Sequence, residues 1–508
     1  MTQYAATDVR TDGSGQLTAS QREIWALARR TREHAALSLS YALLITGPLD
    51  VPALTGAFDD VLLVHEPLRT LYPAVAGEPA AVVLEPAAVA AALDLVPRTV
   101  PGLADAGRIA DEQRSRRFDL STEVPIRAAL LLISPGADSD APTAEPHHVL
   151  LLTLHHIAAD GWSLHTLGLA LSKSYAARRD GRPAALEPAL IDCGEHARDQ
   201  QDWLASAAGA QEVDWWRARL RAASPRCGLP SSAAADGTGT RLRRQVVALP
   251  DDLVNHIREV ARHAVASPFV LLLAAFKALL LSWTGVTEPI VGTLAANRPT
   301  APSATVLGAH YNPLLTSTDL RGDPSLAECL LRTSATMLAV LDHQRLPFPA
   351  LLNRLGTELN WADAAPPEAM FLMDRYPMDA LRLAGCDVIG LYLDDETTGV
   401  PAATPARLTF FTREVNGALT LSALYPPDAL SDGAVAQALQ VYQEILIDLC
   451  ESPQTPVSTY AALFGEPLPD AVRPAPGELT LRPVTELAPV EVLSPVGAWS
   501  QWYERRSP

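Results

Sequence analysis

Cysteine is scarce in this sequence and follows no pattern. The 508 residues include five cysteines that lie far apart, and no two of them form a C-x-x-C pair. This spacing is typical of reduced thiols and not of a disulfide framework. It indicates a cytoplasmic protein.

Positive charge is also in deficit, and long apolar runs are missing. The 40 Lys and Arg residues against 58 Asp and Glu residues give a net charge of −18, which argues against a nucleic-acid or membrane-surface partner. A local basic patch would still allow an acidic partner. The first 16 residues lack the apolar core of a signal peptide. The longest apolar run, 268–283, contains Lys277 and is shorter than the ~20 residues of a membrane span, so it predicts a buried helix.

The length of the chain exceeds one ordinary core and predicts two domains with extensions. Helical and strand patterns alternate, which favours helices packed on a mixed sheet, a mixed α/β (α+β) fold. In the first half the patterns predict helices or strands at 20–32, 37–45, 51–65, 104–116, 126–133 and 163–176. In the second half they predict elements at 244–249, 251–264, 267–283 and 289–293.

The two ends of the chain have a different composition from the rest. Residues 1–15 are polar and predict a flexible N-terminus. Residues 466–508 contain eight prolines and predict an extended arm. An aromatic cluster at 499–503 within this arm is either a docked patch or a peptide that binds a partner.

Two adjacent histidines, His155 and His156, follow the apolar run 149–154 and precede the predicted helix. Successive side chains of an extended segment point in opposite directions, so the two imidazoles cannot share one task. One neutral imidazole could act as a general base, which is worth about 10²–10⁴ in rate. Asp160 could be the base instead, or could hold the turn through an arginine. Gly161 either clears a path for a long substrate or permits a positive φ.

Three other interpretations of this segment remain open. The histidines and Asp160 could form a hydrogen-bonded core cluster without a catalytic role. A metal site would need further ligands, and none follows at familiar spacing, since 147–148 lies beyond the strand. A serine hydrolase would need a G-x-S-x-G motif, which is absent, and Ser163 is better explained as a helix N-cap.

The segment His155-His156-Ile-Ala-Ala-Asp160-Gly161 resembles the HHxxxDG signature of nonribosomal peptide synthetase condensation domains. Relatives of these domains include chloramphenicol acetyltransferase, wax ester synthases and polyketide-associated acyltransferases. Further segments resemble the other condensation motifs in the same order, at 17–25, 47–50 with 65–70, 118–128, 291–298, 308–314 and 343–348. The resemblance covers roughly residues 16–465.

The resemblance implies two chloramphenicol acetyltransferase-like lobes, residues 16–180 and 181–465, that form a V-shaped pseudo-dimer with the active site in a tunnel between them. It implies that His156 is the catalytic histidine, with His155 as a packed neighbour and Gly161 as clearance for a pantetheine thioester. It further implies an ion pair between Asp160 and Arg298 that braces the lobes. Residues expected along the substrate tunnel are Trp162, Ser163, Tyr311 and Asn312.

The sequence departs from the family pattern at a few positions. Pro313 stands where threonine usually follows the motif asparagine, and Tyr311 precedes that asparagine, so acceptor recognition is expected to differ. Arg345 and Pro349 replace an aspartate and a glutamate. Both changes make this surface less acidic. They reflect either an altered contact with the carrier protein or evolutionary drift.

The implied function is that of a free-standing condensation enzyme of secondary metabolism. Such an enzyme joins an acyl or aminoacyl thioester, carried on the 4'-phosphopantetheine of a carrier protein that binds in trans, to a small-molecule amine or alcohol. No cofactor or metal bound by the enzyme is expected, and residues 466–508 could assist carrier docking. Alternatives are a coenzyme A-dependent O- or N-acyltransferase and a catalytically silent recruitment domain.

Overall fold

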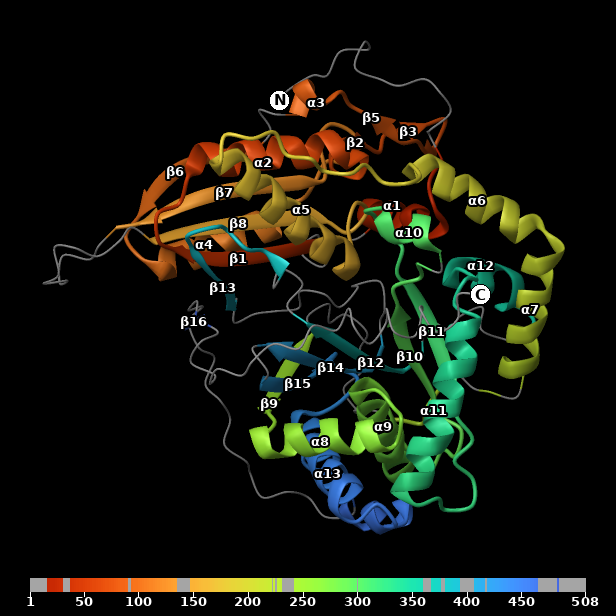
Figure 1. The fold of residues 1–508 in the computed structure, drawn as a ribbon. Helices are drawn as coiled ribbons and strands as arrows, with labels where there is room; N and C mark the ends of the chain where they lie inside the picture. The colour runs from red at the N-terminus through yellow and green to blue at the C-terminus, as the bar shows by residue number, and fades with distance from the viewer. Residues whose placement is uncertain are drawn as a thin grey trace, which may run out of the picture.

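The chain folds around two six-stranded sheets, as the computed structural model shows (Figure 1). Each sheet forms one lobe together with the helices that pack on it. The structure describes residues 16–30, 37–89, 93–134, 147–221, 223, 226–230, 242–298, 300–359, 367–375, 380–392, 406–415, 418–464 and 482–483. The predicted N-terminal segment 1–15, the aromatic cluster 499–503 and nearly all of the predicted arm lie outside these ranges.

The first sheet has the strand order β16-β13-β1-β8-β7-β6. Its central strands β1, β8 and β7 pair antiparallel, and β6 joins β7 in parallel. The strands are β1 (Ser38–Thr46), β6 (Asp94–Val100), β7 (Ile126–Ile133), β8 (His147–His155), β13 (Asp387–Tyr392) and β16 (Arg482–Pro483). Short strands lie beside it at β2 (Thr70–Leu71), β3 (Ala74–Val75), β4 (Glu78–Pro79) and β5 (Val82–Val83).

Helices cover both faces of the first sheet. Helices α2 (Val51–Val64) and α5 (Gly161–Arg179) pack on one face and α4 (Leu103–Ser115) packs on the other. The buried side of α2 repeats with helical spacing through Leu54, Phe58, Val61 and Leu62. The carboxylate of Asp50 caps this helix by accepting from the Ala53 amide at 2.9 Å. The remaining short helices of this lobe are α1 (Ala19–Arg30), η3 (Glu66–Arg69) and α3 (Pro86–Val89).

The second sheet has the order β11-β10-β12-β14-β15-β9, and four helices cover one of its faces (Figure 1). These helices are α8 (Asp251–His263), α9 (Pro268–Thr284), α11 (Leu326–Asp342) and α13 (Asp432–Glu451). The strands are β9 (Arg243–Ala248), β10 (Ile290–Ala295), β11 (Asn312–Ser317), β12 (Ala369–Arg375), β14 (Leu408–Val415) and β15 (Ala418–Tyr425). The other elements are α6 (Cys193–Ala205), α7 (Ala207–Leu220), α10 (Ala301–Thr305), α12 (Phe348–Leu355) and η6 (Val457–Phe464).

The apolar run at 268–283 forms the core helix α9, as the sequence predicts. Its Lys277 is fully buried and donates to the Thr316 carbonyl at 3.0 Å and to the Thr318 hydroxyl at 2.6 Å. Within the described ranges, no helix alone has the length and apolarity to cross a membrane. Helices α8 and α9 have that length and apolarity only when taken together, and the pair is bent by 102°.

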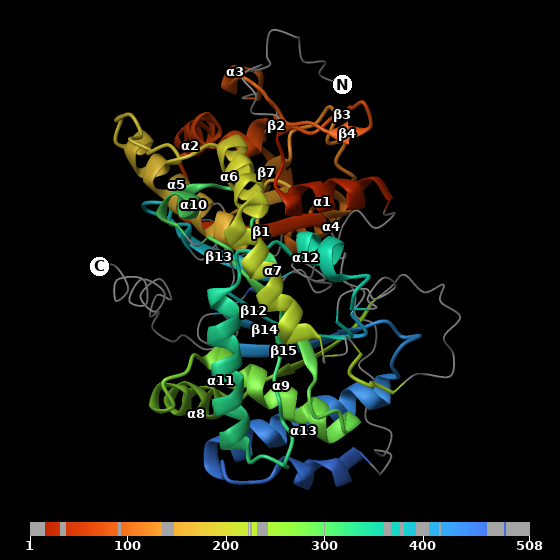
Figure 2. The same ribbon diagram turned by 90° about the vertical axis from the view of Figure 1, so that its right-hand side faces the viewer.

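One strand joins the two halves of the chain. Strand β13 lies in the range predicted for the second lobe, yet it pairs with β1 in the first sheet, Leu43 opposite Gly390. The first lobe is therefore not a continuous piece of sequence, whereas the predicted division at residue 180 treats it as one. Helices α6 and α7 run along one side of the molecule from the first lobe to the second (Figure 2).

Candidate active site

The histidine pair lies at the junction of a buried strand and a helix. Strand β8 ends at His155, and α5 begins at Gly161. Backbone hydrogen bonds from His155 to the Pro125 carbonyl and from His156 to the Leu37 carbonyl, at 2.9 and 2.8 Å, hold the turn. The N-cap of α5 is Asp160, and the predicted assignment of Ser163 as N-cap is wrong. An N-cap accepts from an amide two or three residues on, and Asp160 accepts from Ser163.

His155 points into the packing of the first lobe. Its ring meets Phe118 edge-on, with centroids 5.6 Å apart, and its Nδ1 accepts from the Ile157 amide at 3.1 Å. The guanidinium of Arg127 covers the Phe118 ring at 3.6 Å. These contacts give His155 a place in the core, on the side opposite to His156.

His156 has one engaged and one free ring nitrogen. Its Nδ1 lies 3.2 Å from the Ala159 carbonyl, which can only accept, so Nδ1 carries the proton. Its Nε2 then holds a lone pair and has no hydrogen-bond partner among the described residues. Burial lowers the pKa of His156 below 6.5 against the opposing charge of Asp160. The imidazole is therefore neutral at pH 7 and can accept a proton.

Asp160 and Arg298 form a buried, two-pronged ion pair. Arg298 follows β10 in the second lobe and donates to both carboxylate oxygens at 2.9 Å. Their side chains are 4% and 2% exposed. Burial alone would raise the pKa of Asp160, but the charge and hydrogen bonds of Arg298 outweigh it and hold the pKa at about 2. A carboxylate so fully ionised and hydrogen-bonded is a brace and a poor base.

Further donors saturate the Asp160 carboxylate. The Ser163 amide and hydroxyl lie 2.9 and 2.8 Å from Oδ1, and the amides of His310 and Tyr311 lie 3.0 and 3.2 Å from Oδ2. The Ser163 hydroxyl also lies 3.0 Å from the carbonyl of Gly308. Ser163 thus belongs to the brace between the lobes, although the resemblance places it along the tunnel.

Gly161 and Trp162 are the first two residues of α5, and both are exposed. A Cβ added to Gly161 would meet no atom within 4 Å, and the residue is not in the left-handed region, so the positive-φ explanation is wrong. The clearance role of Gly161 stays a prediction. Trp162 is 39% exposed and donates from its indole to the Ala304 carbonyl at 3.0 Å.

Tyr311 and Asn312, both predicted along the tunnel, have different surroundings. The Tyr311 ring meets His156 with centroids 5.6 Å apart and an interplanar angle of 63°. The amide of Asn312 donates to the carbonyls of Gln344 and Leu346 at 2.9 and 2.7 Å, and its oxygen accepts from the Phe348 amide at 2.7 Å. Asn312 thus ties β11 to the 343–348 segment. A residue pattern does not reveal such a contact.

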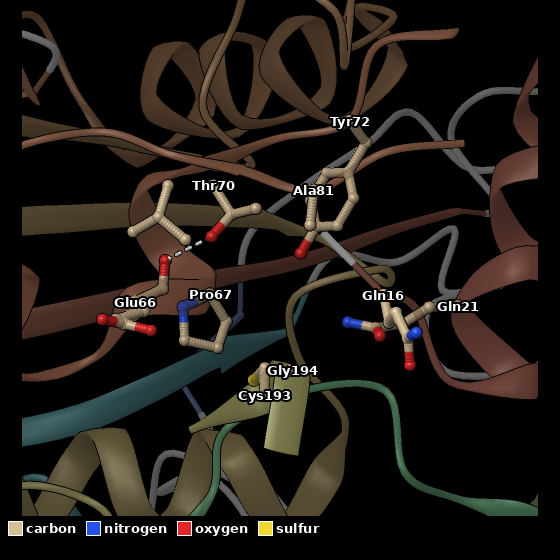
Figure 3. Close-up of a pocket in the computed structure, with 10 residues that line it drawn as sticks. Gln16, Gln21, Glu66, Pro67, Thr70, Tyr72, Ala81, Cys193 and Gly194 are labelled. Carbon is tan, nitrogen blue, oxygen red and sulfur yellow. Dashed lines mark hydrogen bonds between the residues drawn. The ribbon is translucent and has the colours of Figure 1, made fainter. Parts of the chain in front are cut away.

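The segment resembling the first condensation motif packs directly on the histidine turn. The side chain of Gln21 donates to the Ile157 carbonyl at 3.3 Å and accepts from the Thr18 amide at 3.0 Å. Gln21 also borders a cavity of about 10 Å³ between η3, β5 and the start of α6, and Tyr72 and Cys193 are among the other residues that line it (Figure 3). This volume holds about one water molecule. The sequence contains the motif but does not show that Gln21 supports the turn.

The 343–348 segment packs on the helices that connect the lobes. The His343 ring stacks on Trp215 at 3.8 Å, and its Nδ1 lies 2.9 Å from a Glu212 oxygen. The guanidinium of Arg345 lies 4.5 Å above the Trp203 ring. Arg345, which departs from the family pattern, therefore has an intramolecular partner on α6, Trp203.

No group of three or more His, Cys, Asp or Glu side chains is arranged as metal ligands within the described ranges. The site consists of a neutral histidine with a free nitrogen, a buried brace and an open space beside the helix start. With a mixed sheet and its helices in each lobe, it defines a protein of the chloramphenicol acetyltransferase-like fold.

The particular family follows from the comparison of the whole chain. The Condensation domain profile matches residues 12–465, and the chain belongs to this family. Condensation domains are acyltransferases that form amide bonds from substrates held on carrier proteins. The predicted family and fold are thereby confirmed.

Similar curated proteins are nonribosomal peptide synthetases. The isonitrile lipopeptide synthase of Mycobacterium tuberculosis is 28% identical over 88% of this chain and 18% of the synthase. The phosphinothricin tripeptide synthetase PhsC of Streptomyces viridochromogenes is 31% identical over 68% of this chain and 31% of PhsC. The chain thus spans less than a third of either relative.

Solved structures agree with the fold. The X-domain from teicoplanin biosynthesis superposes with a TM-score of 0.72 at 25% identity and covers 88% of this chain and 97% of the X-domain. SgcC5 from Streptomyces globisporus gives a TM-score of 0.68 at 22% identity, with 87% of this chain and 100% of SgcC5 covered.

Proposed function

We propose that this chain is an active condensation enzyme with His156 as its base. The observation that supports the proposal most strongly is the free, buried Nε2 of His156 on an imidazole whose Nδ1 is fixed by Ala159. The donor is an acyl or aminoacyl group on the phosphopantetheine of a carrier protein that binds in trans. The acceptor is a small molecule with an amine or hydroxyl group.

In the proposed reaction the acceptor nitrogen or oxygen attacks the thioester carbonyl carbon. His156 Nε2 takes the proton of the nucleophile, and a tetrahedral intermediate forms. Its collapse breaks the C–S bond, and the proton on His156 passes to the leaving thiolate. The products are an amide or ester and the free pantetheine thiol. The Asp160–Arg298 brace keeps the turn that carries His156 in place.

The test compares wild type with His156→Ala and with His165→Ala. The second variant is a control that changes a histidine on α5, outside the site. Carrier proteins loaded with a panel of acyl and aminoacyl groups serve as donors, and mass spectrometry measures product and free carrier. His156→Ala is expected to keep its fold by circular dichroism and to lose about 10²–10⁴ in rate. His165→Ala is expected to resemble wild type.

Matched acyl-coenzyme A donors in the same assay address the first alternative. Transfer from coenzyme A and none from the carrier would favour the coenzyme A-dependent acyltransferase. A folded wild type that binds the carrier and transfers from neither donor would favour the silent recruitment domain. A fully active, folded His156→Ala variant would disprove the role of His156.

A further inference from the structure

The free nitrogen of His156 is covered by protein in this structure. The residue is 6% exposed, and its Nε2 is buried without a hydrogen-bond partner among the described residues. The two nitrogens of an imidazole point to nearly opposite sides of the ring, and Nδ1 faces the Ala159 carbonyl of its own turn, so Nε2 points away from the turn. A base must come within about 2.6–3.2 Å of the proton that it removes. A neighbouring group therefore has to move before His156 can act.

Tyr311 packs against His156 from the second lobe. The two rings have centroids 5.6 Å apart and an interplanar angle of 63°. The Tyr311 side chain is half-buried and lies on an apolar cluster of the first lobe that includes Ile157 and Ala158 of the histidine turn. The ring thus covers the turn that carries the base. Because it is only half-buried, its outer side leaves it a direction in which to move.

The backbone at Tyr311 is fixed, whereas its side chain is not. The Tyr311 amide donates to Asp160 at 3.2 Å, and its carbonyl accepts from the Ser20 hydroxyl at 3.4 Å. The next residue, Asn312, is held by three side-chain hydrogen bonds, and Pro313 has a restricted φ. The Tyr311 hydroxyl forms no hydrogen bond to any residue that the structure describes. A change of the Tyr311 rotamer would therefore break none of these hydrogen bonds, whereas a movement of the loop would break several.

We propose that the Tyr311 ring is a gate to the catalytic base. In this structure the ring covers His156, and a rotation of the Tyr311 side chain uncovers Nε2 when an acceptor enters. While the gate is closed it keeps water from the base. Asp160 binds the Tyr311 amide, so the brace between the lobes also sets the position of the gate. This inference rests on the proposed function for the identity of the base, and it adds the step that admits the acceptor.

The first test measures how fast diethyl pyrocarbonate modifies His156 at about pH 7, with mass spectrometry of the modified peptides. The reagent attacks neutral imidazoles, and burial keeps His156 neutral at this pH, so a slow reaction reports cover and not protonation. In wild type, His156 is expected to react about tenfold or more slowly than the exposed His256 of α8. Tyr311→Ala should accelerate the reaction of His156 about tenfold. Tyr311→Phe, which keeps the ring, should match wild type.

His155 is the internal control for the fold of the turn, because it lies beside His156 and packs on Phe118. It should stay unmodified in all three proteins. The gate would be overturned by a wild type in which His156 reacts as fast as His256, a result that needs no variant to fold. It would also be overturned by a folded Tyr311→Ala variant in which His156 reacts no faster than in wild type, or in which His155 becomes equally reactive.

The second test follows the products formed from the carrier-bound donor. With the ring gone, water can reach the base and attack the thioester carbon. His156 passes the proton of the water to the leaving thiolate, the C–S bond breaks, and a free acid and the pantetheine thiol result. Tyr311→Ala should therefore raise the ratio of free acid to condensation product, and Tyr311→Phe should leave it as in wild type.

The two tests separate the gate from the reaction. An unchanged ratio of free acid to condensation product in Tyr311→Ala would overturn the gate as a barrier to water. A folded wild type that acylates no acceptor would overturn the proposed function. The modification rates of His156 would in that case still decide whether Tyr311 covers it, because they require no turnover.

Discussion

The guanidinium of Arg298 donates one hydrogen bond to each carboxylate oxygen of Asp160, both at 2.9 Å, and joins the histidine turn of the first lobe to the second lobe. The two residues are 138 positions apart in the chain. Because Asp160 also caps α5, one carboxylate connects the helix start, the turn and the opposite lobe.

Asp160→Ala is expected to destabilise the protein by about 3–5 kcal/mol, because it leaves the charge of Arg298 buried without its partner. Urea unfolding followed by circular dichroism measures the loss. The double variant with Arg298→Met should be more stable than Asp160→Ala alone, since the unpaired charge is gone. A single variant within about 1 kcal/mol of wild type would show that the pair is not a brace.

The pH dependence of catalysis should follow His156. Burial lowers its pKa, and the neutral form is the active base, so kcat/KM should stay high at pH 6.5 and fall only at lower pH. The measurement needs an acceptor that does not itself ionise between about pH 5 and 8. An acid limb centred at or above pH 6.5 would contradict the structure.

The pH dependence of stability should include a contribution from His65 at the end of α2. Burial lowers the pKa of His65 from 6.5 to about 4. Between these values the unfolded chain binds a proton that the folded chain does not, so the free energy of unfolding falls as the pH is lowered from 6.5 to about 4. The full loss is about 3 kcal/mol. His65→Gln should reduce the difference between the free energies of unfolding at pH 7 and pH 4.5, each measured by urea titration. A difference equal to that of wild type would refute the assignment.

Two glycines near the site should respond in opposite ways to alanine. Gly161→Ala meets no atom within 4 Å and should leave the melting temperature unchanged. Gly308 has φ +148°, and an added Cβ would lie 2.6 Å from the His310 ring, so Gly308→Ala should destabilise by about 1–3 kcal/mol. Calorimetry measures both, and equal effects would count against this geometry.

The clearance role of Gly161 needs a larger substitution. Gly161→Leu should fold and should lower kcat/KM for the carrier-bound donor, whose pantetheine arm is proposed to pass beside α5. An unchanged kcat/KM would remove this role.

Much of the local structure was predictable, because local signals set it. The strand 126–133 matches β7, and the helix predicted at 51–65 is α2, which follows the cap at Asp50 and the helical spacing of its apolar residues. The helix predicted at 163–176 is α5, but it begins two residues earlier. The sequence does not show whether Asp160 or Ser163 provides the cap, because either side chain can.

The sequence alone determined the family, through motifs that keep their order, and with it the expectation that His156 and Asp160 differ in role. The tertiary structure decided the partners. It pairs β13 with β1 across the predicted boundary, uses Asn312 to hold the 343–348 segment, and leaves Nε2 of His156 without a hydrogen bond within the described residues. Caps and periodicity act over a few residues and are written in the local sequence. Strand pairing and buried hydrogen bonds depend on groups that only the fold brings together.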